Sequence, residues 1–178
     1  MNVANACTEL MVQYAAYHRD RRNIATHFVG IPLIVFGVVI LLSRPSFELA
    51  GTVLSPAVLA WVLATLWYFS KGNAGLAAAV SLVNGVLVLA AQPIALLTTS
   101  VWLSWGIGAF VLGWFIQFVG HYYEGKKPAF VDDIRGLMVG PMFVTAEALF
   151  AVGWGKALQA AIESRVGEKK KKKMHTAP

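Results

Sequence analysis

The sequence is short of cysteine and of charge, and each shortage excludes a class of protein. Its single cysteine, Cys7, excludes an intrachain disulfide and a metal or redox site of the Cys-x-x-Cys type. Only 13% of the 178 residues are charged and 57% are hydrophobic, which is too apolar for a soluble domain of this length. The apolar runs are long enough to cross a membrane, which takes about 20 residues. The sequence therefore predicts an all-α, polytopic membrane protein.

Four predicted transmembrane helices account for most of the apolar residues. They are expected at residues 23–42, 50–69, 74–91 and 101–120. Asn23 is the predicted N-cap of the first helix. Residues 3–17 mix apolar and polar side chains, which favours an N-terminal interfacial helix over a spanning one. We expect a single integral membrane domain over residues 1–166 and a basic, disordered tail over residues 167–178.

Basic residues orient these helices. They gather before the first expected span, after the second and after the fourth, at Arg19, Arg21, Arg22, Lys71, Lys126, Lys127 and Arg135. By the positive-inside rule these segments are cytoplasmic. The run Lys169 to Lys173 is interpreted as a solvated cytoplasmic tail that touches anionic lipid headgroups. We expect both termini in the cytoplasm, no cleavable signal peptide and no nucleic-acid partner, and the oligomeric state stays open.

A fifth apolar segment, residues 137–154, is interrupted by Gly140 and Pro141. A single crossing would carry the C-terminal lysines outside. We therefore interpret the segment as a hairpin broken near Pro141 that re-enters the membrane or lies at its interface, with a full fifth span as the alternative. It carries Glu147, and an intramembrane carboxylate is costly enough to be a functional candidate. The alternative for Glu147 is a structural partner of a buried donor.

Three of the four histidines lie at the ends of expected spans. His18 and His27 flank the start of the first span and His121 ends the fourth, so the orientation places all three at the cytoplasmic face. Nine residues of one continuous helix would put His18 and His27 on opposite faces, so a chain break between them is required if both bind one ion. Neutral imidazoles suit Fe(II), zinc or copper, and three protein ligands leave positions open for a substrate.

Carboxylates are candidates for a fourth ligand or for catalysis. Glu124 lies one turn after His121 and shares its helix face if that helix continues. Glu147 and a water molecule are the other candidates. Two other classes of protein stay open: a bis-histidine haem protein in electron transfer, with His27 and His121 as axial ligands, and a non-catalytic scaffold or transporter in which the histidines are only polar boundary residues.

Two histidine motifs resemble those of a known family. The residues concerned are Tyr17-His18, Asn23, His27, Gly30-Ile31-Pro32, Gln117-Phe118-Val119-Gly120-His121 and Lys126-Lys127-Pro128-Ala129. They are similar to the small membrane 2-hydroxy fatty acid dioxygenases, whose fungal member acts in phytosphingosine breakdown at the endoplasmic reticulum. The resemblance covers about residues 10–155, and one departure is Arg19, where the fungal pattern has a further histidine. The resemblance implies that His18, His27 and His121 hold Fe(II).

The resemblance also implies a reaction. A long-chain 2-hydroxy fatty acid and O2 would give the acid shorter by one carbon, CO2 and water, and the four electrons released are those that O2 accepts. The acyl chain would stay among the spans and membrane lipids, while Arg22, Lys126 or Lys127 pairs with the carboxylate. Asn23 and Gln117 are expected to support the metal ligands. The alanine- and glycine-rich spans favour a bacterial inner membrane, and the endoplasmic reticulum is the alternative in a eukaryote.

Overall fold

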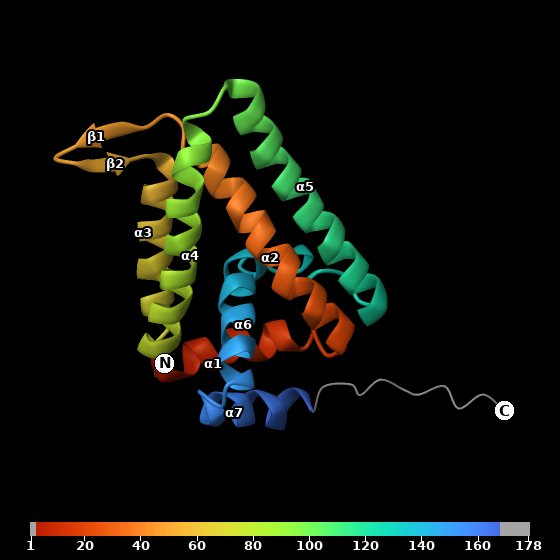
Figure 1. The fold of residues 1–178 in the computed structure, drawn as a ribbon. Coiled ribbons are helices and arrows are strands. Elements are labelled where there is room, and N and C mark those ends of the chain that lie inside the picture. Colours follow the sequence, from red (N-terminus) through yellow and green to blue (C-terminus); the bar gives the residue numbers. More distant parts are fainter. Residues whose placement is uncertain (1–2, 168–178) are drawn as a thin grey trace.

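The computed structural model describes residues 3–167, and these are mostly helical (Figure 1). The helices are α1 (Val3–Ala15), α2 (Arg21–Leu42), α3 (Pro56–Phe69), α4 (Ala74–Ala95), α5 (Thr99–Glu124), α6 (Gly136–Ala151) and α7 (Lys156–Val166). The strands β1 (Phe47–Leu49) and β2 (Thr52–Leu54) form an antiparallel hairpin, and the 3-10 helix η1 (Ala129–Val131) precedes α6. Of the predicted tail, residues 168–178 lie outside the described residues.

Three of the predicted spans are present as long apolar helices. Helices α2, α4 and α5 have 22, 22 and 26 residues and are apolar enough to cross a membrane. Helix α2 packs along α5, and α3 packs along α4 (Figure 1). Large apolar side chains point outward from these helices, including Leu82 and Leu89 on α4 and Phe115 on α5, each at least 65% exposed. Large apolar side chains exposed on helices of this length are suited to lipid rather than water.

The second predicted span is shorter than expected. Residues 47–54 form the β-hairpin, which turns at Gly51 with φ 76°, and α3 begins only at Pro56 behind its N-cap Ser55. The prediction of helix from residue 50 is therefore wrong, because a turn glycine and a proline at the first helical position set a later start. The 14 residues of α3 rise about 21 Å, less than the ~30 Å hydrocarbon layer.

The start of α2 also differs from the prediction. The N-cap is Asp20, whose Oδ1 accepts from the Arg22 backbone N–H at 2.8 Å, so the prediction of Asn23 as the cap is wrong. Asn23 lies in the first turn of α2, fully buried, with its side chain directed inward. The chain break expected between His18 and His27 is present, since α1 ends at Ala15 and α2 begins at Arg21.

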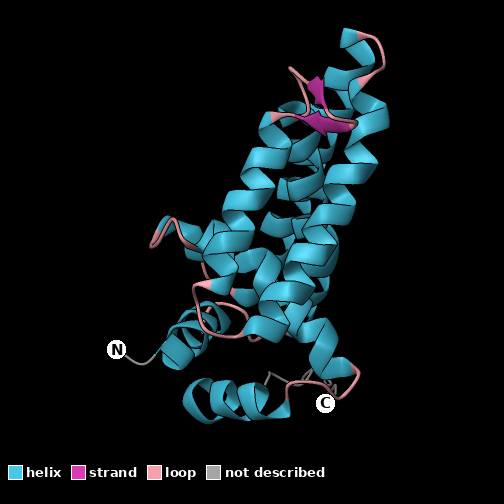
Figure 2. Ribbon diagram, turned by 90° about the vertical axis from the view of Figure 1, so that its left-hand side faces the viewer, coloured by secondary structure: helices cyan, strands magenta, loops and turns pink. Residues whose placement is uncertain are grey.

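The fifth apolar segment forms α6, and its break is not at the proline. Helix α6 continues through Pro141, and the bend of 113° falls after Ala151, where Gly153 and Gly155 adopt positive φ. The predicted break near Pro141 is therefore wrong. Figure 1 shows α6 beginning beside the middle of α2 and ending next to α7, near α1. The β-hairpin lies at the opposite end of the molecule (Figures 1 and 2). A bent pair of this kind fits either a broken span or a re-entrant segment, so both interpretations of the fifth apolar segment stay open.

Replacing Gly37 by alanine is expected to destabilise the pair α2 and α5. A Cβ at Gly37 would lie 2.6 Å from the Phe110 backbone nitrogen and 2.7 Å from the Gly106 carbonyl oxygen, so the helices must separate. We expect a loss of about 1–3 kcal/mol in unfolding free energy, measured by circular dichroism in detergent micelles. Gly108→Ala is the matched control, because a Cβ there meets nothing within 4 Å. Equal stability of the two variants would contradict the close approach of these helices.

Candidate metal centre

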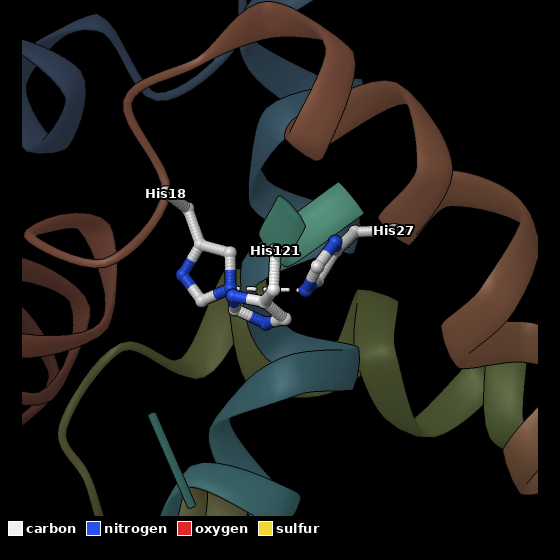
Figure 3. A group of neighbouring side chains, drawn as sticks. All are labelled: His18, His27 and His121. Atoms are coloured by element: carbon white, nitrogen blue, oxygen red, sulfur yellow. Dashed lines mark hydrogen bonds between the residues drawn. The ribbon is translucent and has the colours of Figure 1, made fainter. Parts of the chain in front are cut away.

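Three histidines from separate segments meet in one buried cluster (Figure 3). His18 lies in the link between α1 and α2, His27 in α2 and His121 in the last turn of α5, and none is more than 6% exposed. One ring nitrogen of each lies within 4.8 Å of the others. The Nε2 atoms of His18 and His27 are 2.9 Å apart. The structure thus brings these three side chains together as expected, and their role as metal ligands stays a prediction.

Hydrogen bonds at the far side of two rings determine where their lone pairs point. His18 Nδ1 lies 2.7 Å from the Tyr14 carbonyl oxygen and His27 Nδ1 lies 2.8 Å from the Asn23 carbonyl oxygen. A carbonyl only accepts, so each Nδ1 carries the proton and each neutral ring presents an Nε2 lone pair to the other. Two lone pairs at 2.9 Å repel each other unless a metal ion or a third proton lies between them.

A metal ion fits this position better than a proton. Burial lowers the pKa of His18 well below its ordinary value, and charge on His27 lowers it further, so a third proton is held weakly. Around His18 the surroundings are aromatic: the Tyr14 ring stacks on it at 4.1 Å between centroids and Phe143 lies at 5.4 Å. Two nitrogens bound to one ion at about 2.0–2.1 Å are at most about 4.2 Å apart. The spacing of His18 and His27 therefore suits one shared ion.

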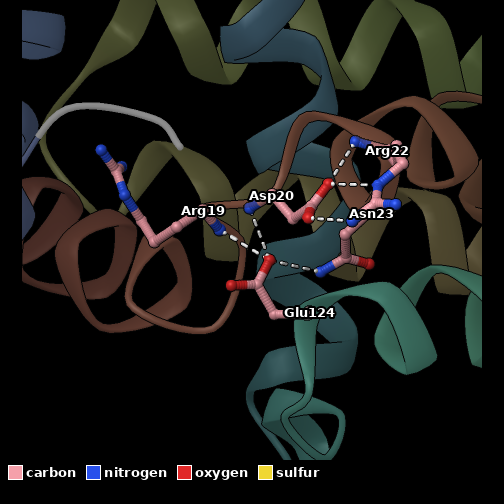
Figure 4. Close-up of polar contacts among 5 residues, drawn as sticks. All are labelled: Arg19, Asp20, Arg22, Asn23 and Glu124. Atoms are coloured by element: carbon pink, nitrogen blue, oxygen red, sulfur yellow. Dashed lines mark hydrogen bonds and ion pairs between the residues drawn. The ribbon is translucent and has the colours of Figure 1, made fainter. Parts of the chain in front are cut away.

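Glu124 fixes the link that carries His18 (Figure 4). Its Oε2 accepts from the backbone N–H groups of Arg19 at 2.9 Å and Asp20 at 2.6 Å, and from Asn23 Nδ2 at 3.2 Å. Helix α5 continues past His121 to Glu124, which is the condition for the two residues to share a helix face. Glu124 is 5% exposed. These contacts give Glu124 a positioning function, and a catalytic function for it stays a prediction.

Glu147 lies half-buried on α6 and is absent from the residues that line the cavity beside the histidines. It acts electrostatically on Arg19, a 7% exposed side chain whose guanidinium donates to the Gly167 carbonyl. Burial lowers the pKa of Arg19, and the carboxylates of Glu163, Glu147 and Glu124 raise it in part. Arg19 therefore joins the link to the end of α7, and the catalytic role of Glu147 stays a prediction.

The basic residues expected to bind a substrate carboxylate all have partners elsewhere. Each has one at 2.5–2.8 Å: Arg22 with Asp20, Lys127 with Asp132, and Lys126 with the Ala16 carbonyl. None of the three basic side chains lines the cavity beside the histidines. Their role in substrate binding stays a prediction.

A cavity of about 60 Å³ adjoins His27 and His121. It lies among α2, α5, α6 and residues 128–130, and no charged side chain of the described chain lines it. The side chains with polar atoms that line it are Tyr14, His27, Trp114, Gln117 and His121. Sequence reasoning missed Tyr14, and its signal was the spacing: Tyr14, Asn23 and Gln117 each precede a histidine of the cluster by four residues.

Comparisons with known proteins place this centre in a family. The model of the family described as 2-hydroxy-palmitic acid dioxygenase Mpo1-like matches residues 4–152. The chain belongs to the Mpo1-like family. It is 31% identical over 155 residues to the 2-hydroxy-palmitic acid dioxygenase MPO1 of Saccharomyces cerevisiae (strain ATCC 204508 / S288c), across 84% of this chain and 83% of the yeast protein. No solved structure matches the chain. The resemblance found in the motifs is confirmed, and the Mpo1-like match contains all three histidines.

Glu124→Ala is expected to weaken metal binding without removing a histidine. The variant deletes the acceptor of three hydrogen bonds that hold the link and Asn23, and losing groups that orient ligands typically reduces metal affinity about 10–100-fold. Glu124→Gln keeps an accepting oxygen and should lose less. Calorimetric titration with Co(II) measures the affinity, and Glu48→Ala on the exposed hairpin is the control. Unchanged affinity in Glu124→Ala would separate this carboxylate from the histidine cluster.

Proposed function

We propose that the protein is an Fe(II)-dependent dioxygenase that shortens 2-hydroxy fatty acids by one carbon with release of CO2. The observation that carries the proposal is the pair of facing Nε2 lone pairs on His18 and His27, completed by His121, in a chain of the Mpo1-like family. Fe(II) held by these three histidines would supply the redox chemistry with O2 and sites for the substrate's carboxylate and hydroxyl. O2 accepts the four electrons that the one-carbon shortening releases, so no further reductant is needed.

The chain's own residues would orient the ligands and exclude water. The Tyr14 and Asn23 carbonyls hold the rings of His18 and His27 with Nε2 directed at the shared point. The Tyr14 ring and Phe143 cover His18 on its apolar side. Apolar surroundings of this kind would exclude bulk water from the metal, so that its open coordination positions stay available to substrate and O2.

We further propose that the end of the molecule with the histidines faces the cytoplasm. Basic residues gather at this end, at Arg21 and Arg22 at the start of α2, at Lys71 beside α1, and at Lys126 beside the link between α1 and α2. Helices α2, α4 and α5, with the shorter α3, would cross the membrane, while α1 and α7 lie along its surface. A bacterial inner membrane is the proposed host, with the endoplasmic reticulum in a eukaryote. A fatty acid could then reach the site from the bilayer with its carboxylate at the headgroup level.

The haem alternative does not suit the cluster. Axial ligands lie on opposite faces of a macrocycle, whereas the ring centroids of His27 and His121 are 5.0 Å apart and His18 lies 4.4 and 5.1 Å from them. The third ring therefore occupies the space that a porphyrin would need. The geometry favours a single ion with three histidine ligands.

Anaerobic reconstitution with Fe(II) tests the function. After 2-hydroxypalmitate and then O2 are added, we expect pentadecanoic acid and one CO2 per acid consumed, measured by mass spectrometry. His27→Ala should lose both bound iron and product, and His175→Ala, which changes the fourth histidine of the sequence, should retain both. Iron bound by the native chain without any shortened acid would overturn the reaction assignment and leave the metal centre standing.

A further inference from the structure

Gln117 is a buried polar side chain whose amide has no partner among the described residues. It is 3% exposed on α5, one turn before His121, and it lines the cavity that also contains His27 and His121. Its Nε2 and Oε1 both lack a hydrogen bond, as does His121 Nδ1. An unpaired buried polar group costs about 1–3 kcal/mol, so most such groups are paired. Two unpaired atoms of one amide beside the proposed iron site point to a polar ligand.

The cavity has room for a small polar head and not for a long chain. Its volume of about 60 Å³ corresponds to roughly four to six water molecules at 10–15 Å³ each. The remainder of its lining is mostly apolar, including Ile31, Ile34 and Leu137. The carboxyl group, carbon two and its hydroxyl match this space, and the rest of an acyl chain must extend out of it.

We propose that Gln117 recognises the 2-hydroxy acid head of the substrate. Its Nε2 would donate to a carboxylate oxygen while its Oε1 accepts from the 2-hydroxyl, so one amide pairs with both functional groups of this head. The assignment rests on the proposed function and deepens it. It makes Gln117 the residue that distinguishes a 2-hydroxy fatty acid from the unsubstituted acid, because without the hydroxyl the Oε1 stays buried and unpaired.

Two other roles for Gln117 make different predictions. If the side chain only packs against α2, where a Cβ at Gly30 would lie 3.0 Å from Nε2, an apolar residue of the same length should replace it without effect on binding. If Gln117 acts through His121, its loss should reduce metal affinity and should weaken the binding of both acids equally. Only direct recognition changes the preference between a hydroxylated and an unsubstituted acid.

Gln117→Met and Gln117→Leu test the proposal with the full-length chain in detergent micelles. Each protein is loaded with Co(II) without O2, and the dissociation constants of 2-hydroxypalmitate and palmitate are measured by displacement of a fluorescent fatty acid. We expect the native chain to prefer the hydroxylated acid and both variants to lose at least 10-fold of that preference, with Co(II) affinity nearly unchanged. Palmitate shares the carboxylate but lacks the 2-hydroxyl, so its binding should weaken less than that of 2-hydroxypalmitate. Gln159→Leu on α7, where the amide bonds to Glu163, is the matched control.

The outcomes separate this assignment from the proposed function. A native preference that persists in Gln117→Met overturns the role of Gln117 and leaves the dioxygenase proposal intact. Reduced Co(II) affinity with an unchanged preference also overturns it, in favour of a role through His121. Metal bound by a native chain that shows no preference for the hydroxylated acid contradicts both proposals. Gln117→Met keeps the length of the side chain, so the test does not depend on the folding of Gln117→Leu.

Discussion

The facing Nε2 atoms of His18 and His27, 2.9 Å apart, are the arrangement on which the rest of this structure depends. Two lone pairs at that distance repel each other, so the protein must hold the rings from outside. It does so with main-chain carbonyls behind each ring and with Glu124, whose Oε2 binds the link before α2 at two backbone N–H groups. Helix packing therefore pre-organises this position, and in the proposed function a bound cation would stabilise it, which would couple metal binding to the stability of the fold.

The close approach of α2 and α5 places the site as well as stabilising the bundle. Helix α5 carries Gln117, His121 and Glu124 on one side, and the residues opposite them belong to α2 or to the link before it. At Gly120 there is no room for a Cβ beside Thr26 and Asn23. Any substitution that separates these helices thus moves both His121 and the Glu124 carboxylate that holds the link before α2.

More of the candidate site than of the local structure could be predicted from the sequence. Charge asymmetry and span boundaries place all three histidines at one end, and the spacing of His18 and His27 requires the observed break. The hairpin before α3, the cap at Asp20 and the continuation of α6 through Pro141 were missed, because each depends on turn chemistry or on packing rather than on apolar periodicity. Glu124 as an acceptor for the link joins residues about one hundred positions apart, which no local pattern encodes.

The cavity beside the histidines has an uncharged lining, and the basic residues near it are paired outside. This difference affects how substrate would bind and product would leave. Arg22 and Lys127 are paired with carboxylates outside the cavity, and no charged side chain of the described chain lines it. In the proposed function, the metal ion would therefore balance the charge of a bound carboxylate. The substrate and the shortened product of the proposed reaction would both carry a carboxylate, but only the substrate would carry the 2-hydroxyl. With Gln117 in the role proposed above, the product leaves its Oε1 unpaired, and the chemistry itself removes the contact that held the head group in place.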